Sequence, residues 1–154
     1  MNKIVSQIRD LSTIEKELST NPAGVLAISV DNEKVAQLAT TFLYQDKNVY
    51  LFFDDDDEFF EGISFETNVS FTIIKNDKVK KSKKNNIEPT YSLLAISVNG
   101  MMRKVEEQKT IEELKQNYLR KYGKSDGDDL NFPSLNNVVI IDSEEIQAFE
   151  ETGG

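Results

Sequence analysis

Any chemistry in this chain has to be done without the two most versatile side chains. The 154 residues include no histidine and no cysteine. The first absence removes the commonest general base and metal ligand, and the second removes thiol nucleophiles, disulfides and zinc or iron–sulfur ligation. Serine–histidine hydrolases and histidine-ligated metalloenzymes are therefore excluded unless another chain supplies the missing group. Carboxylates, lysines and five tyrosines remain, and nothing pairs any tyrosine with a base. We predict no catalytic residue.

An uninterrupted acidic run extends from Asp54 to Glu58. Hard cations prefer carboxylate oxygens, but a calcium loop alternates its ligands around a glycine, and contiguous carboxylates point in different directions. We therefore predict no metal site here. Phe59, Phe60, Ile63 and Phe65 follow at spacings that suit a short helix, and carboxylates at the start of a helix are favoured by its dipole.

Two other clusters in the sequence have both a functional and an ordinary interpretation. A group of phenylalanines could wall a flat aromatic ligand, although such groups more often form a core. The Lys78–Lys84 tract is basic within a chain of net charge −9, but it lacks the interleaved aromatic residues that stack on bases. We interpret it as a solvated hairpin tip and predict no nucleic-acid partner. The phenylalanines are Phe52, Phe53, Phe59, Phe60, Phe65 and Phe71.

Length and composition indicate one domain over residues 1–154, because a chain of this size builds one core more readily than two. With 38% hydrophobic and 29% charged residues, the composition is that of a globular protein. No apolar run approaches the roughly 18 residues that span a bilayer, and the polar start does not resemble a signal peptide. We expect a cytoplasmic protein without a membrane partner.

Hydrophobic spacing predicts mostly short strands between a few helices. Apolar residues from Ile4 to Leu18 recur at threes and fours, so residues 1–20 are predicted to be an N-terminal helical segment, with Ser12 capping a second short helix. Residues 75–89 are predicted to be a flexible polar loop. Strands are predicted at Val25–Val30, Val35–Tyr44, Val49–Phe53, Val69–Ile74, Tyr91–Val98, Met101–Val105 and Val138–Ile141, with Glu145–Phe149 as a continuation or partner.

A longer helix is predicted over Thr110–Tyr122. Ile111, Leu114 and Leu119 lie on one face of it, Thr110 is in position to cap its start, and Gly123 is in position to end it. Its apolar face should pack on the predicted strands.

The order of these segments resembles the pyridoxamine 5′-phosphate oxidase-like, FMN-binding split β-barrel family, in its general-stress and pyridoxamine-oxidase-related branch. The resemblance extends from about Pro22 to Gly153 and rests on NPAGVLAISV, QLATTFLYQDKNVYLFF, NVSFTII, YSLLAISVNGMMRKV and the closing IIDSEEIQAFEETGG. It implies an α+β split β-barrel of about six or seven mostly antiparallel strands with flanking short helices. It also implies a homodimer with two FMN sites at the subunit interface.

The same resemblance implies a cofactor site. The segment Gln37–Phe42 matches the one that lines the isoalloxazine ring, and its polar side chains could form hydrogen bonds with that ring. Where the family places a serine or threonine and a lysine after the strand matching Val49–Phe53, this chain has its acidic run. Carboxylates repel a dianionic phosphate, so we expect FMN binding to be weak or lost. The predicted cofactor-binding residues are Gln37, Thr40, Thr41, Phe42, Phe53, Asp54 and Asp57.

Three classes of function follow from these observations. The first is an FMN-binding or FMN-derived split-barrel protein, with flavin-dependent oxidoreductase activity on a small molecule, in which the flavin supplies the reactive groups that the chain lacks. The second is a cofactor-free split-barrel protein that binds another small aromatic molecule or a protein partner. A binder of nucleic acid or of acidic surfaces through the lysine tract ranks well below both.

Overall fold

One antiparallel sheet of eight strands, flanked by three helices, makes up the part of the chain that the structure describes. The computed structural model describes residues 3–31, 34–77, 91–123 and 135–153. The strands are β1 (Lys3–Gln7), β2 (Gly24–Asp31), β3 (Lys34–Thr40), β4 (Leu43–Gln45), β5 (Asn48–Phe53), β6 (Thr67–Asp77), β7 (Tyr91–Val105) and β8 (Asn137–Gly153). The helices are α1 (Leu11–Thr20), α2 (Glu58–Glu61) and α3 (Gln108–Lys121). The α+β prediction is confirmed.

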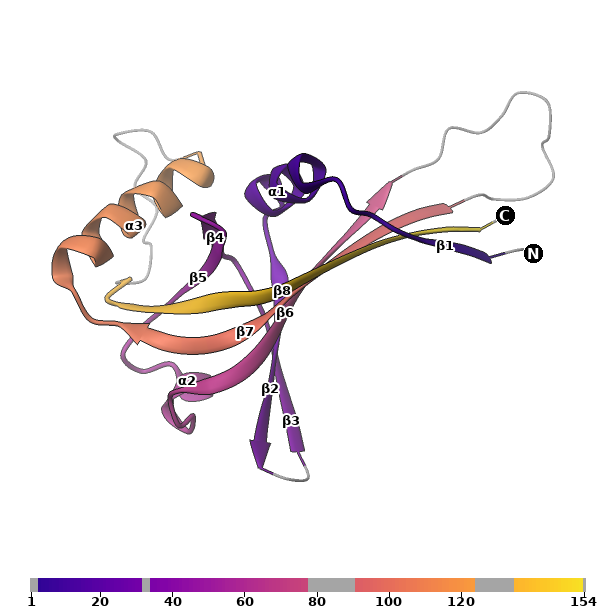
Figure 1. Cartoon of the computed structure of the whole chain (residues 1–154). Coiled ribbons are helices and arrows are strands. Elements are labelled where there is room, and N and C mark those ends of the chain that lie inside the picture. Colours follow the sequence, from indigo (N-terminus) through magenta and orange to yellow (C-terminus); the bar gives the residue numbers. More distant parts are fainter. Residues whose placement is uncertain (1–2, 32–33, 78–90, 124–134, 154) are drawn as a thin grey trace.

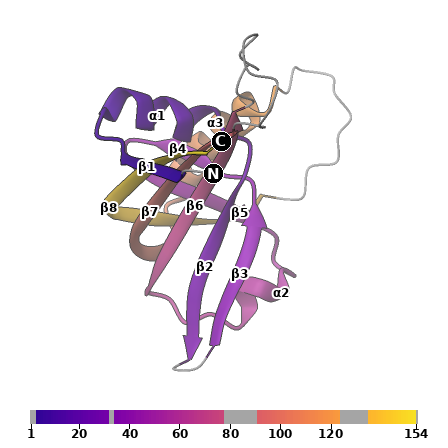
Figure 2. The same cartoon turned by 90° about the vertical axis from the view of Figure 1, so that its right-hand side faces the viewer.

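Three long strands form the centre of the sheet, whose order is β3-β2-β6-β7-β8-β5-β4 with β1 added on β8. Figure 1 shows α1 and α3 on the same side of these strands, and α2 near the opposite end of the molecule from both. The β2–β3 hairpin projects away from α1 and α3, as Figure 2 shows from the side. The two ends of the described chain lie together because β1 pairs with the end of β8 (Lys3 with Gly153).

Alternating side chains of the strands build the core. Along β7 the inward positions are every second residue, including Leu94, Ile96 and Val98, as expected for a strand with one buried face. Strand β5 is buried on both sides: Val49 and Leu51 join the main core, whereas Tyr50 joins a second cluster under α3. These two clusters fix β5 between the main core and the long helix.

The N-terminal segment differs from the prediction. Residues 3–7 form strand β1, and only residues 11–20 are helical. Ile4 and Val5 are β-branched and are 61% and 55% exposed, so their helix-like spacing does not mark a buried face. Pairing with β8 determines their conformation instead. Ser12 does not cap the helix, because the N-cap position belongs to Asp10, whose carboxylate accepts hydrogen bonds from the hydroxyls of Ser12 and Thr13.

Three other predicted boundaries are wrong. The predicted polar loop overlaps β6, which continues to Asp77; residues 78–89, with the lysine tract, lie outside the described residues. The strands predicted on either side of Asn99-Gly100 are one strand, β7, and a register shift at these residues takes up one extra residue of β8. The strand predicted at Val35–Tyr44 is two strands, because β3 ends at Thr40 and β4 begins at Leu43. The prediction that Glu145–Phe149 continues the last strand is confirmed, since β8 extends from Asn137 to Gly153.

The long helix is confirmed, but its start is not. Helix α3 begins at Gln108, with Glu107 at the N-cap position, so Thr110 lies inside the helix. Gly123 follows its end with a positive φ of 69°, which glycine adopts without strain. Ile111 and Leu114 are buried in the cluster under the helix, and Leu119 packs against its edge.

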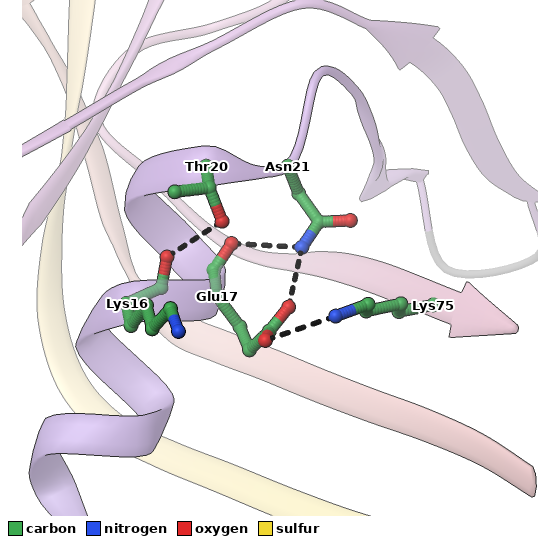
Figure 3. Close-up of polar contacts among 5 residues, drawn as sticks. All are labelled: Lys16, Glu17, Thr20, Asn21 and Lys75. Carbon is green, nitrogen blue, oxygen red and sulfur yellow. Dashed lines mark hydrogen bonds and ion pairs between the residues drawn. The ribbon is translucent and has the colours of Figure 1, made fainter. Parts of the chain in front are cut away.

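A buried carboxylate ties α1 to the sheet (Figure 3). Glu17 is the one charged residue among the buried residues of the described chain, with 9% of its surface exposed. One carboxylate oxygen pairs with Lys75 of β6 at 3.2 Å, and the other accepts a hydrogen bond from the Asn21 amide at 3.2 Å. Because both oxygens have partners, the carboxylate is compatible with its burial.

Candidate functional site

A pocket with acidic and aromatic walls opens between the end of β5, helix α2 and the end of β7. We call it the acidic pocket, and its volume is about 200 Å³. Three carboxylates (Asp55, Asp57 and Glu61) and one lysine, Lys104, line it. The remaining lining residues are Phe53, Phe60, Ile63, Phe65 and Asn137.

Local structure holds two of these carboxylates in place. Asp57 is the N-cap of α2, and its Oδ1 accepts a hydrogen bond from the backbone N–H of Phe59 at 3.0 Å. Asp55 Oδ1 accepts one from the Asn137 side chain at 2.6 Å. The prediction that the acidic run begins a short helix is therefore confirmed, and the same run places negative charge around the pocket.

The aromatic walls are equally ordered. The rings of Phe53 and Phe60 stack with their centroids 4.1 Å apart, and Phe59 meets Phe60 edge to face. The ammonium of Lys104 lies 5.1 Å from the centroid of the Phe65 ring, within the range of a cation–π contact.

A second polar cluster lies between the end of α3 and the connection from β3 to β4. We call it the tyrosine–lysine cluster; its members are Thr41, Tyr118, Lys121 and Tyr122. The hydroxyls of Thr41 and Tyr118 are 2.7 Å apart. The Tyr122 hydroxyl accepts from the backbone N–H of Phe42 at 3.1 Å and lies 2.8 Å from the carbonyl oxygen of Pro22. These contacts connect the end of α3 to two loops, the one between α1 and β2 and the one between β3 and β4.

Lys121 is the most perturbed ionisable group of this cluster. Its ammonium donates to the carbonyl oxygen of Phe42 at 2.9 Å and lies 3.6 Å from the centroid of the Phe42 ring. No carboxylate among the described residues pairs with it. Burial lowers the pKa of Lys121 from 10.5 to about 8, because removal from water disfavours the charged form.

This lowered pKa makes the stability of the protein depend on pH. Above pH 8 the folded protein loses the Lys121 proton, whereas the unfolded chain keeps it up to about pH 10.5. The unfolded state then binds more protons, so the free energy of unfolding should rise with pH. We expect the native protein to gain stability relative to Lys121→Met between pH 7.5 and 9.5, as measured by urea unfolding at each pH. A difference that stays constant over this range would show that Lys121 does not titrate there.

The predicted cofactor residues fall into two groups, which share only the main core, where Phe42 is buried and against which Phe53 packs. Gln37 and Thr40 lie on β3, but an odd spacing along a regular strand directs their side chains to opposite faces of the sheet. Thr41 is exposed, and Phe42 is fully buried against Phe71. The second group lies near α2: Phe53 and Asp57 line the acidic pocket, and the carbonyl oxygen of Asp54 accepts a hydrogen bond from the backbone N–H of Asp57.

The sequence did not predict several residues of the acidic pocket and of the tyrosine–lysine cluster. Glu61, Lys104 and Asn137 reach the acidic pocket from three separate elements, and Lys121 reaches the tyrosine–lysine cluster from the last turn of α3. The helical spacing of Tyr118 and Tyr122 was the one available signal, since residues four apart share a face. Nothing in the sequence indicates that Lys104 or Asn137 would meet the acidic run.

Two further features of the described residues bear on function. None of the helices is long and apolar enough to cross a membrane. In the ranges that the structure covers, no three carboxylates are grouped closely enough to hold a metal ion.

Comparison with known proteins identifies the fold. No protein-family model matches the chain, and neither does any curated protein. Solved structures do: a candidate 5-nitroimidazole antibiotic resistance protein from Bacteroides thetaiotaomicron superposes with a TM-score of 0.75 at 14% identity, over 100% of this chain and 93% of the other. An FAD-binding protein from Mycobacterium smegmatis superposes with a TM-score of 0.66 at 14% identity, over 96% of this chain and 99% of the other. An FAD-binding protein from Mesorhizobium loti superposes with a TM-score of 0.66 at 16% identity, over 96% of this chain and 98% of the other.

A candidate pyridoxamine 5′-phosphate oxidase from Corynebacterium glutamicum is also similar, with a TM-score of 0.63 at 15% identity over 100% of this chain and 98% of the other. The chain therefore has the α+β split-barrel fold of pyridoxamine 5′-phosphate oxidase-like proteins, as its segment order predicted. The expected six or seven strands are eight in the described residues. At these identities the likeness establishes the fold and leaves the function to the residues of this chain.

Proposed function

We propose that this protein is a flavin-binding split-barrel protein. The observation that carries the proposal is the agreement of fold over nearly the whole length of two FAD-binding proteins, 99% and 98% of their chains. A bound flavin would supply hydride or electron transfer to a chain that has no histidine or cysteine. Oxidoreductase activity on a small molecule is the reaction class that this cofactor implies.

The residues fit the two parts of a flavin unequally. Gln37 is exposed on an edge strand, where its amide can form hydrogen bonds with the polar edge of an isoalloxazine ring. The acidic pocket does not fit a phosphate, because its three carboxylates outnumber its one lysine. We therefore propose that the ring, and not the phosphate, provides the binding energy, and that riboflavin binds at least as well as FMN.

A cofactor-free small-molecule-binding protein is the second candidate. The contact between Thr41 and Tyr118 favours this candidate. The Thr41 hydroxyl, which was expected to form a hydrogen bond with the isoalloxazine ring, instead contacts the Tyr118 hydroxyl of the same chain. The two candidates differ in their optical properties, since only the first binds a yellow ligand.

The test of ring-directed binding is a pair of fluorescence titrations, with riboflavin and with FMN. Asp57→Asn/Glu61→Gln removes two charges from the acidic pocket, and the asparagine can still cap α2. We expect this variant to gain affinity for FMN by roughly 1–3 kcal/mol while its affinity for riboflavin stays nearly constant. Glu112→Gln/Glu113→Gln on α3 is the matched control. An equal gain for both ligands, or none for FMN, would place the phosphate away from this pocket.

A homodimer is the assembly we propose. The register sets Ile74, Ala95 and Phe149 side by side on the sheet face opposite the core, and Ile74 and Phe149 are 60% and 39% exposed. Pairing of two such faces around a twofold axis would bury them. We expect light scattering to give twice the chain mass of 17.5 kDa, and Ile74→Asp to give the single mass. Leu11→Asp, at an exposed position on α1, should leave the dimer intact.

A further inference from the structure

Lys121 carries a partly buried amine that the proposed flavin binding does not use. We propose that its side-chain nitrogen is a covalent binding site for a small aldehyde, which it holds as an imine. In this reaction the neutral amine attacks the aldehyde carbon, both amine protons pass to the aldehyde oxygen, and that oxygen leaves as water, so that a C=N double bond remains. The step requires no oxidant or reductant. This proposal does not depend on flavin binding.

The surroundings of Lys121 are those of a reactive lysine and not of a structural ion pair. Among the described residues no carboxylate pairs with it, and its ammonium donates to a backbone carbonyl oxygen, that of Phe42, at 2.9 Å. Thr41 and Phe42 make up the connection that supplies this carbonyl, and neither carries a charge. The other titratable groups of the tyrosine–lysine cluster are the phenols of Tyr118 and Tyr122. No negative charge in the cluster therefore holds the lysine in its protonated form.

Burial keeps part of this amine in the neutral form that attacks a carbonyl. Removal from water lowers the pKa of Lys121 from 10.5 to about 8. At pH 7 about one amine in ten is then neutral at Lys121, against fewer than about one in a thousand for an ordinary exposed lysine. Because Lys121 is partly exposed, a small reagent can reach it from water. The amine is thus both available and accessible for attack on a small carbonyl compound.

The contacts of the nitrogen favour an aldehyde over an acylating agent. A protonated imine keeps one N–H and the positive charge, so it can still donate to the Phe42 carbonyl and interact with the rings of Phe42 and Tyr122. The centroids of these rings lie 3.6 Å and 5.4 Å from the lysine nitrogen. An amide, which acylation would form, carries no charge and loses the cation–π contacts. The geometry of the cluster therefore stabilises the product of an aldehyde in particular.

Propanal is a suitable probe. The full chain, without flavin, is equilibrated with propanal at pH 8 and then treated with borohydride, which reduces each imine to a stable secondary amine that peptide mass mapping locates. Lys109, exposed on the same helix, is the internal control. We expect about tenfold more label at Lys121 than at Lys109, or a larger excess, because far more of the Lys121 amine is neutral. Label at Lys121 that does not exceed the label at Lys109 would overturn the proposal.

Acetic anhydride separates an aldehyde site from an amine that is only reactive. In the native protein the ratio of label at Lys121 to label at Lys109 should be higher with propanal than with acetic anhydride, and equal ratios would contradict an aldehyde site. Phe42→Leu removes the ring but keeps an apolar side chain. It should lower propanal labelling of Lys121 about three- to tenfold without lowering acetylation, because only the protonated imine needs the ring.

An unfolding curve of Phe42→Leu shows whether the variant is folded, because Phe42 is fully buried. If it does not fold, the comparison of the two reagents on the native protein decides the question. Equal loss of label with both reagents in a folded variant would overturn the proposal. Riboflavin binding by the native protein reports separately on the proposed function.

Discussion

Replacement of Gly100 by alanine should destabilise the protein by about 3 kcal/mol or more, the largest effect we expect from adding one methyl group. Gly100 lies at the register shift between β7 and β8, where the strands approach closely. A β-carbon at this position would overlap the carbonyl oxygen of Asp142. Because that oxygen belongs to the backbone, no side-chain rotation relieves the overlap, and the bulge must deform.

Thermal and urea unfolding would measure this effect, with Gly62→Ala as the control. No atom lies within 4 Å of a β-carbon at Gly62, and its φ of −91° suits alanine. We expect this control to change stability by less than about 1 kcal/mol. Similar unfolding midpoints for Gly100→Ala and Gly62→Ala would mean that β7 and β8 leave room for a β-carbon at the bulge.

Leu114→Ala should destabilise the protein by about 2–5 kcal/mol, because a side chain that is 2% exposed is lost from the cluster between α3 and the sheet. Glu113, its neighbour on the same helix, is exposed, and Glu113→Ala should stay within about 0.5 kcal/mol. Urea unfolding of the two variants provides the comparison. Equal effects would show that α3 presents another face to the sheet.

The sequence was most informative where one buried face repeats in a regular pattern. The β2–β3 hairpin, β5 and α3 were predicted because alternation, or a spacing of three and four, reports directly on burial. Residues 3–7 were assigned wrongly because their strand exists through pairing with residues 149–153 of β8, far away in the sequence, and not through local preference. Asn99-Gly100 looks like a turn, but the glycine is there to let two strands approach each other.

The candidate site was less predictable, because it depends on which elements meet in space. The acidic run could be recognised in the sequence, and its capping of α2 followed from the chemistry of helix termini. Lys104 and Asn137 come to the pocket from β7 and β8, whose long pairing cannot be read from either segment alone. The burial of Lys121 depends in the same way on contact between α3 and the connection from β3 to β4.

The most direct test of flavin binding is a riboflavin titration of the purified protein, followed by fluorescence and by the visible absorption spectrum. Our account predicts saturable quenching with one riboflavin per chain and a shift of the flavin bands, because the ring leaves water for a protein surface. An unchanged spectrum with no quenching at saturating protein would contradict it, and would leave a split-barrel protein that works without a flavin.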